Sequence, residues 1–538
     1  MNGNKWVAYF LVGVILTVIL VLASCSSPGQ TPSKTTSTGP IVSPSTASTS
    51  ITPKPPTSAI PATPQSGGSL TILSSSPSVI STIADIPAPA ASALLPTLEP
   101  LIGLSKDGPV PTKLATSWDL GADGKSLTLH LRKGVKFQDG TDFNAAAVKY
   151  NLDLELGVRT EMISVKSVDI VDDYTVKLNL NKYSNTLIWQ LGHVAGLMQS
   201  PAALQAHDKA WFNSHAVGTG PFELVSFNYP TSNVFKKFNG YWDSGKPYLD
   251  ELRTTFVVDP VTAELSFRAG NAQLWEGLLP QNLKSIENLN LNVNTVPRTV
   301  WVAIGDSANP NSPFAKLQVR QAIDYAIDKV SVVKTFGYNT WEAPDQVAYS
   351  RQIGYISNFQ GRKYDVAKAK QLLVDAGYAN GFKTKLIVRN NVDMNVIGTY
   401  QAYLKAVGIN AETVPADTGT YRSLLTKGWD GIILNQLGIS GTAAKMMETD
   451  GPNANWTVSA LITDKYKNAL ALATTAQDKA SELKANQELV QAIFNDAVLI
   501  PWNIDSVSCA YGSSVHTDRN TINLQIWNPG DTWMSKSK

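Results

Sequence analysis

Cysteine is nearly absent from this chain, which has two thiols among 538 residues. Two thiols cannot build a disulfide scaffold, nor a zinc or iron–sulfur site held by four cysteines. A charge excess is missing as well, since 45 Lys and Arg face 43 Asp and Glu and the formal net charge is +2. A nucleic-acid partner would require a clustered basic excess, so none is expected. The length provides chain for two to four domains at about 100–200 residues each.

The motifs of common catalytic sites are also missing. The chain has five histidines, none in an HExxH pattern, and no GxSxG elbow, Walker A loop or GxGxxG turn. Gly218-Thr-Gly-Pro221 is rich in glycine, but a proline follows at once and no lysine does, which favours a structural turn over a phosphate cradle. No spacing singles out a carboxylate pair. The sequence therefore predicts no enzyme, no cofactor and no metal site.

The amino terminus has the pattern of an export signal. Lys5 precedes an apolar run from Trp6 to Ala23, which is long enough to remain as a membrane helix. The run ends in Leu22-Ala-Ser-Cys25, and small residues at this place are typical of a cleaved signal peptide over residues 1–25. The same four residues resemble the bacterial lipobox, which implies lipidation of Cys25. By either interpretation the rest of the chain lies outside the cytoplasmic membrane.

Residues 26–67 are predicted to form a disordered tether. Residues 26–65 contain nine Ser, nine Thr and nine Pro and no aromatic residue, so this stretch cannot bury enough apolar surface to offset the entropy of ordering. The second cysteine, Cys509, lies in an alternating strand-like stretch, and we expect it to be buried.

The remaining chain changes character near residue 299. Before it, short alternating runs such as 127–132 and 174–180 predict strands, and Asn144 is a candidate cap for a helix over 145–156. After it, helices and strands alternate, which predicts a parallel sheet. The expected elements are helix 319–334, helix 366–376 capped by Asp365 and ended by Gly377, strand 384–389, helix 395–407, strand 409–414, helix 419–427, strand 431–434, helix 478–495 and strand 498–502.

Ligands of parallel sheets bind at the carboxyl ends of the strands. Here those ends are predicted at Asn390-Asn391 and at Asn435-Gln436. The chain also has 13 tryptophans, whose large faces suit cores and ligand clefts equally. Candidates for ligand contact, because they lie near the strand ends or the join of the two regions, are Trp301, Trp341, Trp429 and Trp502.

Several segments resemble the peptide/nickel family of ABC-transporter solute-binding proteins, and they occur in the order found in that family. They are Glu99-Pro-Leu-Ile-Gly103, Ala115-Thr-Ser-Trp118, residues 129–143 (LHLRKGVKFQDGTDF), Val217-Gly-Thr-Gly-Pro-Phe222, Asn239-Gly-Tyr-Trp242, Lys246-Pro-Tyr-Leu-Asp250, residues 319–329 (VRQAIDYAIDK) and residues 364–382 (YDVAKAKQLLVDAGYANGF).

The resemblance implies an α/β, two-lobed periplasmic-binding-protein-like fold of class II, with an extra domain inserted in lobe one. Lobe one would comprise residues 68–298 plus 503–538, with the insertion at about 98–214, and lobe two residues 299–502. It also implies a monomer that captures a solute between its lobes, closes, and docks on an ABC permease. Closure would be a population shift, because the solute contacts both lobes only in the closed form.

One departure from the family pattern bears on the ligand. Peptide binders of the family hold the ligand's α-ammonium with an Asp that would fall near Ile439, where this chain has no acid until Glu448 and Asp450. A buried ammonium without a partner costs several kcal/mol. A loop that brings Glu448 or Asp450 inward would restore a peptide site. Otherwise a neutral solute such as an oligosaccharide, stacked on Trp and bonded by Asn435 and Gln436, or a metal chelate, becomes the alternative.

Two further functions stay open from the residues alone. A sensory receptor would report the bound solute to a membrane kinase instead of feeding a permease. An extracellular hydrolase would release products from peptides or glycans.

Overall fold

The computed structural model describes residues 63–105, 107–453, 455–519 and 527–535. Its centre is a sheet of ten strands. Across the sheet, the strands are β10 (Phe222–Asn228), β11 (Ser232–Lys237), β12 (Glu251–Phe256), β1 (Ser69–Ser74), β13 (Leu274–Leu278), β18 (Ile500–Tyr511), β14 (Asn292–Gly305), β17 (Ile432–Gly438), β15 (Phe382–Arg389) and β16 (Ile409–Ala416). Within the described residues, no helix has the length and hydropathy needed to cross a membrane.

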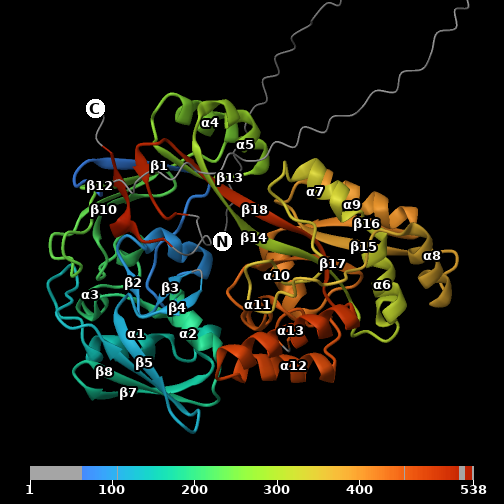
Figure 1. The fold of residues 1–538 in the computed structure, drawn as a ribbon, viewed down its shortest axis with the longest axis horizontal. Helices are drawn as coiled ribbons and strands as arrows, with labels where there is room; N and C mark the ends of the chain where they lie inside the picture. The colour runs from blue at the N-terminus through green and yellow to red at the C-terminus, as the bar shows by residue number, and fades with distance from the viewer. Residues whose placement is uncertain (1–62, 106, 454, 520–526, 536–538) are drawn as a thin grey trace, which may run out of the picture. The chain divides into compact units, whose positions relative to one another are not determined.

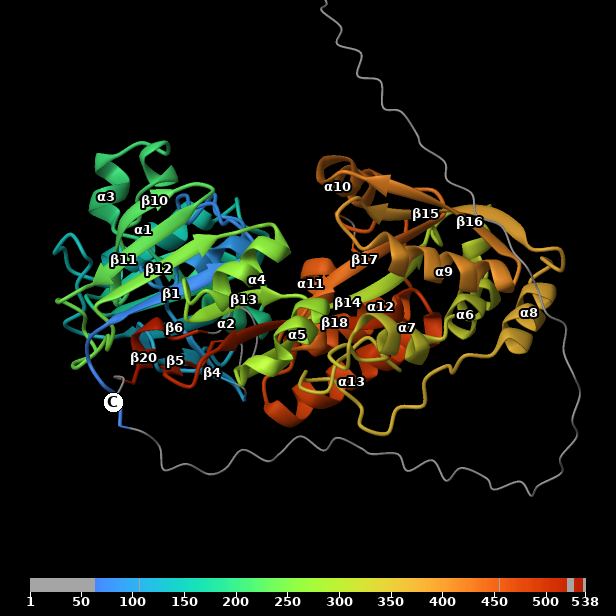
Figure 2. The same cartoon turned by 90° about the horizontal axis from the view of Figure 1, so that it is seen from above.

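Strands β14 and β18 connect two halves of the sheet (Figure 2). They pair antiparallel from Asn292 opposite Tyr511 to Ala303 opposite Ile500. Near one end β18 also pairs with β13, while the far end of β14 pairs with β17. We call the part with β1 and β10–β13 the first half and the part with β15–β17 the second half. The chain therefore crosses between the halves twice, side by side.

The first half carries a segment of its own between β1 and β10, residues 99–206, which we call the inserted segment. It contains a four-stranded antiparallel sheet that packs against α1, whose N-cap Asn144 accepts from the Ala147 N–H at 3.0 Å. Its elements are β2 (Glu99–Pro100), β3 (Gly103–Ser105), β4 (Gly108–Val110), β5 (Ala115–Leu120), β6 (Ser126–Leu131), α1 (Ala145–Glu155), β7 (Val165–Asp172), β8 (Thr175–Leu180), α2 (Thr186–Leu191), β9 (Leu197–Met198) and α3 (Pro201–Ala206). The first half also contains α4 (Pro260–Arg268), α5 (Pro280–Ile286), β19 (Val515–His516) and β20 (Trp533–Met534).

The second half is a sheet with helices on both faces (Figure 1). The β15 strand pairs parallel with β16 and β17, as the alternation of helices and strands predicts. One face packs on α6 (Leu317–Ala326), α7 (Lys329–Phe336), α8 (Val366–Asp375) and α9 (Met394–Ala406); the other packs on α10 (Thr418–Lys427), α11 (Ala443–Asp450), α12 (Asp464–Thr475) and α13 (Lys479–Asp496).

Local capping chemistry explains where these helices begin and end. Asp365 accepts from the Lys368 N–H at 2.8 Å and starts α8, and Gly377 adopts φ +85° after it, as predicted. The single helix predicted over 319–334 is wrong, because Asp328 caps a new helix through the Ser331 N–H and splits the segment into α6 and α7.

Two other predictions can be compared with the fold. Cys509 is fully buried in β18, as expected. The strand predicted over 431–434 is too short, because β17 continues to Gly438 along β14.

Candidate functional site

The carboxyl ends of β15 and β17 meet at the edge of the second half that adjoins the crossing strands. Asn390 and Asn391 directly follow β15 and are exposed, as the strand-end argument requires. Asn435 and Gln436 are not at a strand end, because β17 is longer than predicted. Asn435 is buried and its Oδ1 accepts from the Tyr421 hydroxyl at 3.2 Å, so this amide is part of the interior.

The four candidate tryptophans pack mainly against protein. Trp502 is fully buried, with its ring centroid 4.4 Å from that of Tyr400. Trp301 is buried, and its ring centroid lies 6.2 Å from that of the half-buried Trp341. Trp429 is buried in the core on the opposite face of the sheet. In this structure Trp301, Trp429 and Trp502 therefore present no free aromatic face for a solute to stack on.

Asp450 places a carboxylate at the end of β17. It is the last residue of α11, and its Oδ2 accepts from the Gly438 N–H at 2.8 Å. Burial raises the pKa of Asp450 to about 6, against the lowering effects of that hydrogen bond and of the nearby Arg389 charge. Among the described residues no cation lies within ion-pair distance of this carboxylate. The strand end thus holds an acid that is mostly ionised at neutral pH and makes no ion pair within the described residues.

The positive charge of Arg389 acts on this acid without forming an ion pair with it. Arg389 is the last residue of β15, and its guanidinium lies over the Tyr421 ring, 4.7 Å from the centroid. Its buried Nε has no hydrogen-bond partner in the described residues. The site therefore offers one anionic and one cationic group at neighbouring strand ends. No sequence pattern singled out Arg389, although it directly precedes the predicted pair Asn390-Asn391.

Glu448 and Lys445, on α11, face the inserted segment. The Thr186 hydroxyl of α2 donates to Glu448 at 2.5 Å. Burial lowers the pKa of Lys445 to about 7, although Glu161 and Glu448 favour its charged form. Burial, followed by the Lys445 charge, lowers the pKa of His193 well below its usual value. Of the two acids predicted as ammonium partners, Asp450 therefore lies at the strand end, and Glu448 is engaged by the first half.

A polar cavity of about 130 Å³ lies at the crossing strands. Its lining residues are Thr295, Pro297, Thr340, Glu342, Ser350, Arg351, Ile504 and Asp505. Asp505 is fully buried and ion-paired with Arg298, and it also accepts from the N–H and hydroxyl of Thr299 at 2.8 Å each. No sequence pattern indicated this cavity, because its walls come from β14, β18 and residues 340–351, which become neighbours only in the fold. No cluster of three or more potential metal-ligating His, Cys, Asp or Glu side chains occurs in the part of the chain that is described.

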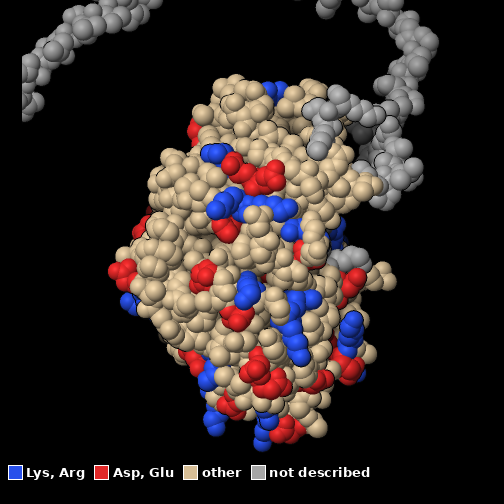
Figure 3. All heavy atoms as spheres, turned by 90° about the vertical axis from the view of Figure 1, so that its left-hand side faces the viewer, with Lys and Arg blue, Asp and Glu red and all other residues tan. Residues whose placement is uncertain are grey.

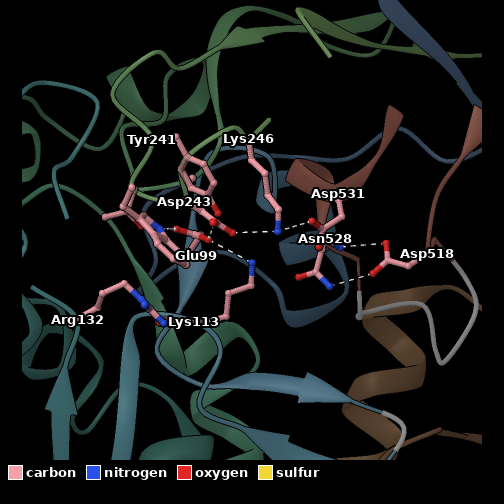
Figure 4. Close-up of polar contacts among 12 residues, drawn as sticks. Glu99, Lys113, Arg132, Tyr241, Asp243, Lys246, Asp518, Asn528 and Asp531 are labelled. Carbon is pink, nitrogen blue, oxygen red and sulfur yellow. Dashed lines mark hydrogen bonds and ion pairs between the residues drawn. The ribbon is translucent and has the colours of Figure 1, made fainter. Parts of the chain in front are cut away.

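A second polar cluster surrounds Glu99 in the first half (Figure 4). Glu99 is 1% exposed and accepts from Lys113, Thr219, Tyr241 and Trp242 at distances of 3.2, 3.3, 2.8 and 2.7 Å. Thr219, Tyr241 and Trp242 lie in two of the segments that carry the family resemblance, and Glu99 lies in a third, whereas Lys113 lies outside them.

Neighbours of the Glu99 cluster belong to the same motifs. The Arg132 guanidinium lies 4.3 Å from the Trp242 ring centroid. A Cβ on Gly218 would lie 2.2 Å from the Thr97 carbonyl oxygen, so the predicted structural turn packs directly on the chain next to Glu99. Charges of both signs are interspersed on the side of the first half that Figure 3 faces.

Comparisons with known proteins agree on one family. Residues 110–457 match the bacterial extracellular solute-binding proteins, family 5 (middle region). The glutathione-binding protein GsiB of Escherichia coli O1:K1 is 31% identical over 435 residues, which cover 77% of this chain and 84% of that protein.

Solved structures show the same fold. The binding protein DppA of Helicobacter pylori, in complex with the peptide STSA, has a TM-score of 0.75 at 21% identity and covers 88% of this chain and 99% of its own. NikA of Brucella suis, in complex with Fe(III)-EDTA, has a TM-score of 0.73 at 22% identity over 83% of this chain and 96% of its own. The predicted two-lobed periplasmic-binding-protein fold is thus confirmed.

Proposed function

We propose that this chain, which belongs to the bacterial extracellular solute-binding proteins, family 5, captures a peptide or peptide-like solute through its α-ammonium group. Membership makes the chain the solute-binding component of an ABC importer, a role without a chemical step. The substrate class is the step beyond membership, and it rests on Asp450.

The position and state of Asp450 carry the proposal. Its carboxylate lies against Gly438, one residue before the place where peptide binders of the family have their acid, and reaches it from the far end of α11. A half-buried carboxylate that makes no ion pair carries a desolvation cost, which the raised pKa of Asp450 reflects. An ammonium group that binds there would remove that cost, so the free energy of closure on a peptide would include relief of an existing penalty.

Arg389 supports a zwitterionic ligand. Its unpartnered Nε and the fixed position of its guanidinium over Tyr421 suit a carboxylate, which guanidinium groups bind through paired hydrogen bonds. A short peptide has both an ammonium and a carboxylate. The names of GsiB and of the DppA complex, a glutathione binder and a protein bound to the peptide STSA, support the same class.

An oligosaccharide receives less support. Sugar sites depend on exposed aromatic faces, and Trp301, Trp429 and Trp502 are buried in this structure. A metal chelate is the other alternative solute, and the ligand panel described below contains one.

To deliver the solute to a permease, the protein must be exported and held at the outer face of the membrane, which is the role we assign to its amino terminus. We infer that Cys25 carries a lipid, that residues 26–67 form the tether and that the closed form docks on a permease. Cys25 lies outside the described residues, so support for the anchor is the Leu22–Cys25 sequence alone. Replacing Cys25 by Ser should release the protein from the membrane fraction, and retention of that variant would show that another segment holds it there.

The substrate class is tested by thermal unfolding with a ligand panel. The panel contains short peptides, the same peptides N-acetylated, oligosaccharides and nickel–histidine chelates. A ligand at 100 times its Kd stabilises the folded protein by about 2.7 kcal/mol. We expect stabilisation by free peptides, loss of it on acetylation, and loss of it in Asp450→Asn but not in the matched control Asp430→Asn, whose side chain is 78% exposed. A response confined to sugars or chelates would overturn the proposal.

A further inference from the structure

The inserted segment contacts the second half of the molecule directly, at a place apart from the crossing strands. Helix α2 and the residue before it lie against α11 and the end of α12 (Figure 1). Residues nearly 300 positions apart in the chain meet there. This contact uses residues other than Arg389 and Asp450 of the strand-end site, although α11 contributes to both.

Asn185 terminates a helix of the opposite half. Its backbone N–H donates to the Thr474 carbonyl at 2.8 Å, and its Nδ2 donates to the carbonyls of Ala473 and Ala476 at 2.9 and 3.2 Å. The last carbonyls of a helix have no donors within the helix and need an outside partner. Asn185 is 9% exposed, so water does not replace these bonds while the halves are in contact.

Trp189 fits against a glycine of the second half. A Cβ added to Gly441, the residue before the N-cap of α11, would lie 2.2 Å from the indole Cη2 of Trp189. Trp189 is 7% exposed. The indole therefore lies directly on the backbone of the second half, and any side chain at position 441 would push it away.

Charged groups at this contact complement each other. Glu448 of α11 accepts a hydrogen bond from Thr186, and the positive charge of Lys182 favours its ionised form. The negative charge of Glu161 favours the charged form of Lys445 of α11. Each pair joins a group of the second half to a group of opposite sign in the inserted segment.

We propose that Asn185 and α2 form a latch that holds the two halves closed without help from the solute. Every contact named above joins protein to protein, so it stabilises the closed form whether or not a solute is present. A larger closed fraction in the solute-free protein tightens binding, because the apparent Kd is the intrinsic Kd of the closed form divided by the fraction of protein that is closed. The inserted segment would thereby set the affinity and the ease of release, while the strand ends set the choice of solute.

The latch is tested on the full chain with no solute added. Nitroxide labels are placed at Lys166→Cys of β7 and Lys484→Cys of α13, both exposed, in a Cys25→Ser background; Cys509 is fully buried and does not compete for label. Protein is stripped of bound solute in guanidinium and refolded, and the distance between the labels is measured by pulsed electron spin resonance. We expect a dominant short distance in the parent protein.

Variants separate the latch from a general loss of folding. Asn185→Ala should lower the ratio of short to long distances about tenfold, whereas Asn181→Ala, an exposed asparagine of the same segment, should leave it unchanged. Gly441→Ala should lower the ratio at least as much. Trp189→Ala combined with Gly441→Ala should be no more open than Trp189→Ala alone, because the added methyl then has room.

Two results would overturn the latch. One is that the solute-free parent protein shows the long distance and no short distance. The other is a distance distribution that Asn185→Ala and Gly441→Ala do not change while circular dichroism shows both to be folded. Since no solute is added, neither result bears on the proposed substrate class.

Discussion

The Glu99 cluster and the strand-end site are both built around a carboxylate, and they differ in how that carboxylate is satisfied. Glu99 accepts from four side chains and is ion-paired with Lys113. Asp450 accepts from one backbone N–H, and burial raises its pKa to about 6. A carboxylate whose bonds are all made within the protein stabilises the scaffold. One that makes no ion pair within the protein is available to a ligand.

The difference shows what the family motifs do in this chain. Three of the four donors to Glu99 come from motif segments, and these three join the inserted segment to the rest of the first half. Nothing in these motifs lies at the strand-end site, where Arg389 and Asp450 are found. We therefore expect the motifs that identify the family to maintain the fold, and residues outside them to select the ligand.

The largest effect expected is that of Glu99→Ala. The substitution leaves the buried Thr219 and the half-buried Lys113, Tyr241 and Trp242 without their acceptor. Removing one partner of a buried charge pair costs about 3–5 kcal/mol, and Glu99 is the buried member here. Chemical denaturation measures the loss in the free energy of unfolding, and calorimetry on the remaining folded protein should give an unchanged Kd. A large change in Kd with little loss of stability would erase the distinction between the two regions.

Asp450→Asn should have the opposite signature. The folded-state pKa of about 6 lies above the ordinary value of 3.8, so ionised Asp450 lowers the free energy of unfolding. This destabilisation is fully present above pH 6 and disappears as the pH falls from 6 to 3.8. Asparagine removes that penalty and still accepts from Gly438. Stability at pH 7 should therefore rise by about 1–2 kcal/mol, while affinity for free peptides falls about 100-fold. A variant that is less stable than the parent at pH 7 and binds peptides normally would place Asp450 with Glu99 as a scaffold residue.

The buried Lys445 is a third charged group, and its effect is measured through the pH dependence of the free energy of unfolding. Its folded-state pKa of about 7 lies below the ordinary 10.5, so between pH 7 and 10.5 the unfolded chain binds one more proton and stability rises with pH. The slope contributed by this one group should be about 1 kcal/mol per pH unit between pH 7 and 9. Lys445→Met should remove it, whereas Lys467→Met, whose side chain is 59% exposed, should not. Equal slopes for the parent and Lys445→Met would mean that this ammonium is solvated.

The smallest effect expected is that of Asn390→Ala. The side chain is exposed after β15, so unfolding should change by less than about 0.5 kcal/mol. Because it adjoins Arg389, we expect a loss of peptide affinity of about threefold to tenfold. An unchanged Kd would confine the solute to the Asp450 side of the strand ends.

Local chemistry predicted much of the second half. The Asp365 cap, the left-handed Gly377 and the parallel pairing of β15 with β16 follow from neighbouring residues and were confirmed. The break between α6 and α7 was missed, because the apolar spacing continues through Asp328 and only the cap reveals it.

The candidate site was harder to predict because its members are distant in sequence. The tryptophans were chosen by their nearness to strand ends, yet which face of the sheet a residue occupies depends on the bulges in β14 and β18. Such bulges give no clear sequence signal. Asp450 was identified only as an acid that a loop could bring inward, and its hydrogen bond to Gly438 depends on how α11 packs. The domain boundaries stay predictions.

The most direct test of the account is isothermal titration calorimetry of the solute-free protein with one short peptide and its N-acetylated form. The two ligands share every group except the positive charge at the amino terminus. If Asp450 holds that charge, the free peptide binds and acetylation weakens binding at least about 100-fold. Equal affinity for the two forms would contradict the assignment of Asp450 and, with it, a peptide as the cargo of this protein.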